Sequence, residues 1–80
     1  MSWLKEQLNN RNMTQKEFAL RCNLSQTAIS CYVNEKYIPK LEHIYVMSRI
    51  LDISVDEFIK GILKKGEWLK WQKKRKHLIF

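Results

Sequence analysis

Two helix-capping signals close together constrain the fold of this chain more than any other feature. Thr14 and Glu17 have the spacing of a capping box, in which the hydroxyl and the carboxylate each accept a hydrogen bond from a backbone N–H left unpaired by the first helical turn. Ser25 is a second capping residue, and only ten residues separate it from Thr14. Asn23 lies between the two caps and tolerates the left-handed backbone of a tight turn. We therefore predict two short helices joined by a tight turn, which together span residues 14–34.

Apolar residues at helical spacing predict three further helices. The first covers residues 2–10, and the fifth covers residues 54–59 and begins with another capping box. The fourth begins at Pro39, whose fixed φ suits the first helical position. No window of the sequence alternates with the period of a strand, so we predict an all-α fold. The residues expected to face the core include Phe18, Ala19, Cys22, Ala28, Ile29, Tyr32, Leu41, Ile44, Met47, Ser48 and Leu51.

Most of the positive charge lies at the C-terminal end of the chain. The 80 residues carry a formal net charge of +7, which favours a polyanionic partner such as nucleic acid. Residues 1–60 contain eight Lys and Arg against seven Asp and Glu, whereas residues 61–80 contain seven against one. A chain of this length suits one small domain. We predict a folded domain over residues 1–60, followed by a basic, aromatic-containing C-terminal extension over residues 61–80.

The capping residues, the turn and the apolar positions together resemble one known family. The matching stretches are Thr14-Gln15-Lys16-Glu17-Phe18-Ala19, Asn23-Leu24-Ser25, Ile29-Ser30, Tyr32, Pro39 and Leu51-Asp52-Ile53-Ser54-Val55-Asp56-Glu57-Phe58. Over about 55 residues this pattern resembles the Cro and phage-repressor type of helix-turn-helix, also called the XRE-like family. The resemblance implies a compact five-helix, lambda-repressor-like DNA-binding domain. It also implies a homodimer on a palindromic operator of double-stranded DNA, with the third helix in the major groove.

The resemblance assigns two sets of DNA-contacting residues. The positions that match readers of base edges are Gln26, Thr27, Ser30 and Cys31. The positions that match phosphate contacts are Gln15, Ser25, Asn34 and Lys36. The chemistry agrees with the first assignment, because the amide of Gln26 offers a donor and an acceptor that can bind adenine bidentately.

The sequence departs from the family pattern at three positions. Asn23 and Glu35 stand where the family usually has glycine, and Val33 stands where it usually has an acidic residue. Asn tolerates the backbone of the turn. A carboxylate at Glu35 would repel phosphates if it faced the DNA.

These features predict a sequence-specific transcriptional regulator of a phage or prokaryote, most simply a small dimeric repressor in the cytoplasm. Alternatives of the same fold are an antitoxin or a controller of a restriction-modification system. A different class is a protein-interaction module that has lost DNA reading. We expect no enzyme activity, cofactor, metal site or small-molecule substrate, because no nucleophile–base pair, metal-ligand spacing or glycine-rich phosphate loop occurs.

The basic extension and the cysteines leave alternatives open. The extension could be a solvated tail, an arm that contacts phosphates, a helix that packs Trp68 and Trp71 on this domain or on a second subunit, or a membrane-surface binder. Cys22 is expected to be a buried thiol, and Cys31 to face outward on the third helix, where oxidation would disturb DNA contacts. His43 is expected to lie on a helix surface.

Overall fold

The structure is a computed structural model that describes residues 2–63, and these form five helices and no strand. The all-α prediction is therefore confirmed, whereas most of the basic extension (residues 64–80) lies outside the described residues. The helices are α1 Trp3–Asn10, α2 Gln15–Cys22, α3 Gln26–Val33, α4 Leu41–Leu51 and α5 Val55–Ile62. None of these helices is long and apolar enough to cross a membrane.

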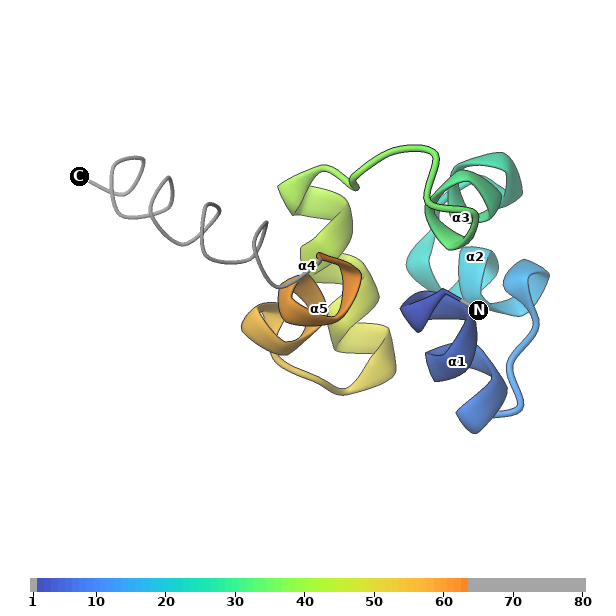
Figure 1. Ribbon diagram of the computed structural model, residues 1–80. Coiled ribbons are helices and arrows are strands. Elements are labelled where there is room, and N and C mark those ends of the chain that lie inside the picture. The colour runs from blue at the N-terminus through green and yellow to red at the C-terminus, as the bar shows by residue number, and fades with distance from the viewer. Residues whose placement is uncertain (1, 64–80) are drawn as a thin grey trace.

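Figure 1 shows α1, α2 and α3 gathered on one side and α4 and α5 on the other, joined by the α3–α4 loop. Contacts connect α2 with α3 and α4, α1 with α3 and α5, and α4 with α5. All five helices contribute to one core. Its members are Leu4, Leu8, Phe18, Ala19, Cys22, Ile29, Val33, Ile44, Met47, Leu51, Phe58 and Ile59.

Four of the five described helices have a side-chain cap at their N-terminus. The hydroxyls of Ser2, Thr14, Ser25 and Ser54 each accept a hydrogen bond from the backbone N–H three residues later, at 3.0–3.2 Å. Each such cap stabilises its helix by about 1 kcal/mol. The second half of the predicted box at Thr14 is not formed, because the carboxylate of Glu17 pairs with Arg21 at 2.8 Å instead.

The start of α4 differs from the prediction. Pro39 is buried but lies before the helix, which has Lys40 as its N-cap and begins at Leu41. Leu41, expected in the core, is 63% exposed. The buried face of α4 begins one turn later, at Ile44. The apolar spacing at the start of this helix therefore placed a surface residue among the expected core residues.

The buried face of α3 is also rotated relative to the prediction. Ile29 and Val33 are its core residues, while Ala28 and Tyr32 are only half-buried. Val33 thus packs in the core at the position where an acidic residue was expected from the family pattern.

The last helix is longer than predicted and contains a glycine. It runs to Ile62 rather than Ile59, with Gly61 in its final turn. A Cβ on Gly61 would overlap the indole of Trp3, which packs edge-on against Phe58 with ring centroids 5.1 Å apart. Gly61 therefore allows α1 to approach α5 closely.

Arg11 ties the first helix to the end of the fourth. Its guanidinium donates to the backbone carbonyl of Leu51 at 2.9 Å and to the side-chain oxygen of Gln7 at 2.9 Å. The carbonyl of Leu51 is one of those that a helix C-terminus leaves unpaired, so Arg11 also acts as a C-terminal cap for α4.

Candidate nucleic-acid interface

The connection between α2 and α3 depends on the left-handed backbone of Asn23. Its φ is 58°, and its N–H bonds back to the carbonyls of α2. The N–H of Leu24 then donates to the carbonyl of Ala19 at 3.0 Å, which closes the turn. Ser25 follows with an extended backbone and caps α3. The predicted tight turn is confirmed, and it fixes the direction in which α3 leaves α2.

The third helix has a buried face and a polar face. Ile29 and Val33 are almost fully buried, so they anchor α3 on the core. The four predicted base readers lie beside this buried stripe, at positions i, i+1, i+4 and i+5, which share one face of a helix. Gln26 and Thr27 are exposed, whereas Ser30 and Cys31 are half-buried.

The polar face of α3 carries no charge. The first turn of each of the other four described helices contains an acidic residue, but the first turn of α3 contains none. The N-terminal end of a helix attracts anions, and an acidic side chain there would oppose an approaching phosphate. The start of α3 is therefore open to an anion, and the side chains that follow it are neutral donors and acceptors.

The predicted phosphate contacts lie at helix ends around this face. Gln15 is the first residue of α2 and is half-buried, and Ser25 caps α3. Asn34 follows the last residue of α3, and Lys36 lies exposed in the loop beyond it. The two sets of predicted residues meet at one point: the amide of Asn34 donates to the hydroxyl of Ser30 at 3.3 Å. The four-residue spacing of Ser30 and Asn34 permits this contact, and the rotamers of the two side chains decide whether it forms.

Comparison with known proteins agrees with this geometry. A family model described as helix-turn-helix matches residues 4–58 of the 80-residue chain. The chain belongs to this family. Its fold and the match identify it as a DNA-binding helix-turn-helix protein of the Cro and phage-repressor type. Searches of curated proteins and of solved structures give no significant match.

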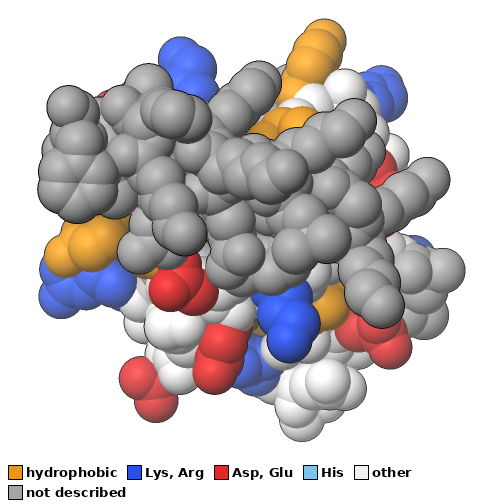
Figure 2. All heavy atoms as spheres, turned by 60° about the vertical axis from the view of Figure 1, so that its left-hand side comes forward, with side chains coloured by type: hydrophobic (Ala, Val, Ile, Leu, Met, Phe, Trp, Pro, Cys, Tyr) orange, Lys and Arg blue, Asp and Glu red, His pale blue; other side chains and the backbone are white. Residues whose placement is uncertain are grey.

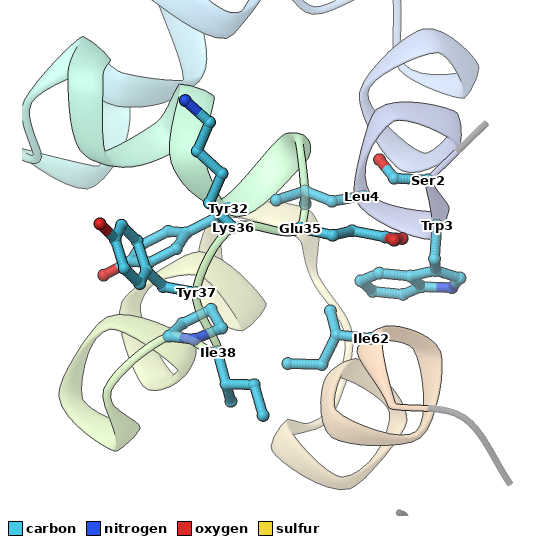
Figure 3. Close-up of a pocket in the computed structure, with 10 residues that line it drawn as sticks. Ser2, Trp3, Leu4, Tyr32, Glu35, Lys36, Tyr37, Ile38 and Ile62 are labelled. Carbon is cyan, nitrogen blue, oxygen red and sulfur yellow. The ribbon is translucent and has the colours of Figure 1, made fainter.

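Glu35 of this helix-turn-helix protein points away from the expected DNA side. Its φ of 60° is left-handed, as suits the glycine of the family pattern. Figure 3 shows its carboxylate directed toward Ser2 and Trp3 at the start of α1, whereas Lys36 extends in a different direction, beside α3. The carboxylate that could have repelled DNA is therefore turned into a hollow on another side of the loop.

A hydrogen bond that sequence reasoning missed connects α3 to α4. The hydroxyl of Tyr32 and Nδ1 of His43 are 2.6 Å apart, and their rings lie 5.9 Å apart. Burial raises the pKa of the Tyr32 hydroxyl, with smaller effects of Cys31 and Glu42 in the same direction. His43 is half-buried rather than a plain surface residue, and it positions the helix that carries the polar face.

The described part also contains two cysteines, Cys22 and Cys31, and charged side chains. Cys22 is buried as predicted, and burial raises the pKa of its thiol to about 11, which keeps it protonated. Cys31 is a free, half-buried thiol on α3. Among residues 2–63 no group of three or more His, Cys, Asp or Glu could hold a metal ion. Both acidic and basic side chains of the described part are visible on the face in Figure 2.

Proposed function

We propose that this protein is a sequence-specific transcriptional repressor that binds a palindromic operator as a homodimer. The observation that carries the proposal is the construction of α3. Two core residues hold it on the domain, and a neutral polar face remains available at its outer side. A helix of this kind fits the major groove, where each base pair presents a distinct pattern of donors and acceptors.

The two sets of side chains have different tasks in this proposal. Gln26, Thr27, Ser30 and Cys31 face base edges and set sequence preference. Gln15, Ser25, Asn34 and Lys36 hold the phosphate backbone and set the register of α3 in the groove. The bond from Asn34 to Ser30 supports this division, because it fixes the Ser30 oxygen as an acceptor and leaves its proton free for a base.

In this proposal, repression results from the presence of the dimer on its operator. A dimer that covers two half-sites in one operator would exclude RNA polymerase from an overlapping promoter. Such half-sites lie about one helical turn of DNA apart, or a multiple of it, because the two recognition helices enter the same face of the duplex. The compartment that fits this activity is the cytoplasm of a prokaryotic cell.

The experiment that tests the proposal is selection of random duplex DNA by the full-length protein at physiological salt. We expect an enriched palindrome, and protection of both half-sites by a dimer in footprinting and sedimentation. Retention of all sequences alike, lost as salt rises, would contradict sequence-specific reading. The domain would then be better understood as a scaffold for protein partners.

A matched pair of variants separates the two tasks on the selected operator. Gln26→Ala should relax preference at one base pair per half-site, at a cost of roughly 1–3 kcal/mol for the preferred base. Gln15→Ala should weaken binding to all sequences by a similar factor, because it removes a phosphate contact. If Gln26→Ala also weakens all sequences equally, Gln26 does not read a base.

A further inference from the structure

The described part of the chain exposes an unusual group of apolar side chains. Its five exposed large hydrophobic residues are Leu20, Tyr37, Ile38, Leu41 and Tyr45. All but Leu20 belong to the α3–α4 loop and the first half of α4, and they form what we call the apolar patch (Tyr37, Ile38, Leu41 and Tyr45). Leu41 and Tyr45 lie one helical turn apart and so share a face of α4. Exposed apolar groups that cluster in this way mark an interaction surface, whereas single ones do not.

The apolar patch continues into a hollow. A cavity of about 300 Å³ lies between the start of α1, the α3–α4 loop and the end of α5. Tyr37 and Ile38 line it from the loop, and Trp3 and Ile62 line it from the two helices (Figure 3). The surface therefore reaches from the outer side of α4 to the last turn of α5.

The position of the chain end indicates which segment covers this surface. The described residues end at Leu63, directly after Ile62 in the wall of the hollow. The next eight residues, 64–71, contain Trp68, Leu69 and Trp71. An extended chain of five residues reaches about 17 Å, so the first of these side chains can return from Leu63 to the hollow and the patch beside it. A segment tethered this closely has an effective concentration of about millimolar, which a separate molecule rarely reaches.

Charged side chains of both signs border the surface, because Lys36 also lines the hollow and the guanidinium of Arg49 lies 5.7 Å from the centre of the Tyr45 ring. Glu35 projects into the hollow, and Glu42 is exposed on α4 beside Leu41. Neither carboxylate has an ion-pair partner among residues 2–63, where the salt bridge found joins Arg21 to Glu17. Lys64 and Lys65 follow Leu63 directly.

We propose that residues 64–71 fold back onto their own domain and cover the apolar patch. The two tryptophans and Leu69 bury the apolar surface, and the lysines after Leu63 approach Glu35. This intramolecular contact is independent of DNA binding and goes beyond the proposed function.

The test uses the full-length protein labelled with fluorotryptophan and observed by 19F NMR. The chain has three tryptophans, assigned by single replacements with phenylalanine, and Trp3 reports on the fold itself. We expect the Trp68 and Trp71 signals to lie away from their positions in the urea-unfolded chain. The double variant Leu41→Ser, Tyr45→Ser should return both signals to the unfolded positions, while the Trp3 signal, which also reports on the hollow, stays away from its own unfolded position.

Leu20→Ser is the matched control, because Leu20 is 74% exposed but lies on α2, outside the patch. It should leave all three signals unchanged. Trp68 and Trp71 at the unfolded positions in the wild-type protein would overturn the proposal. So would signals that move with protein concentration in parallel with dimer formation, because a second copy would then cover the patch.

Discussion

Glu35 occupies a backbone conformation that glycine adopts far more easily. For a residue with a Cβ, the left-handed region costs roughly 1–2 kcal/mol. Replacement by glycine removes this cost, but glycine has more conformational freedom in the unfolded chain, which offsets part of the gain in stability. With φ at 60°, we expect Glu35→Gly to raise the free energy of unfolding by about 1 kcal/mol, as measured by urea denaturation. Glu35→Ala is the control, because it removes the carboxylate but keeps the Cβ. Equal effects of the two changes would show that the backbone conformation is not the cause.

Cys22 predicts a dependence of stability on alkaline pH. Burial raises the pKa of its thiol from 9.0 to about 11. Between these values the unfolded chain has lost the thiol proton while the folded chain keeps it, so the free energy of unfolding falls as pH rises through this window. We expect a loss of about 2 kcal/mol by pH 11 that Cys22→Ala does not show. Urea denaturation at pH 8, 9, 10 and 11 would measure it.

The comparison between the wild-type protein and Cys22→Ala isolates the contribution of Cys22. Tyr32, whose pKa is also raised, shifts stability in the same direction but is present in both proteins. Parallel pH profiles for wild type and Cys22→Ala would refute the assignment.

At the scale of the helices, the packing of α1 on α5 depends on a missing side chain. Alanine is normally favoured over glycine inside a helix by about 1 kcal/mol. Because a Cβ on Gly61 would overlap the Trp3 indole, we expect Gly61→Ala to lower the free energy of unfolding, by roughly 1–3 kcal/mol. Thermal and urea unfolding would measure the change.

A double-mutant cycle identifies the cause. In a Trp3→Ala background the overlap is removed, so the same Gly61→Ala change should be neutral or stabilising. A destabilisation of equal size in both backgrounds would show that Gly61 serves the backbone of α5 rather than the approach of Trp3.

Local chemistry made some elements predictable and left others open. Thr14, Ser25 and Ser54 were predicted as caps because a capping hydroxyl acts on its own helix, and Asn23 because the turn needs its backbone. Pro39 was misplaced by two residues, since its fixed φ also suits the extended segment before a helix. Leu41 was misassigned because a spacing of three residues fits the edge of an apolar face as well as its centre.

In the candidate site, too, some features follow from the local sequence and others do not. The polar face of α3 follows from helical spacing and from the resemblance to known helix-turn-helix proteins. The four-residue spacing of Ser30 and Asn34 permits their hydrogen bond, but the side-chain rotamers decide whether it forms. The link from Tyr32 to His43 depends on tertiary structure, and no spacing in the sequence indicates it. The direction of Glu35 likewise follows from the path of the loop.

At the scale of the whole chain, the excess positive charge lies in the C-terminal extension and not in residues 1–60. Residues 1–60 are nearly neutral, and the run of four basic residues at positions 73–76 carries much of the excess. If this run contacts phosphates, replacing all four residues by glutamine should reduce the slope of log K against log salt, by about 1 or more. Operator titrations in the full-length protein at several salt concentrations would measure it. Lys60→Gln on α5 is the control, and an unchanged slope in the four-residue variant would show that the run makes no phosphate contact.

The bond from Arg11 to Leu51 has a consequence for the order of folding. Most helices here pair with neighbours close in sequence, which favours rapid formation, but this bond closes a loop of 40 residues. During synthesis, Arg11 is made well before the carbonyl that accepts its bond. A nascent chain that stops short of residue 51 therefore lacks the contact that joins the first helix to the end of the fourth.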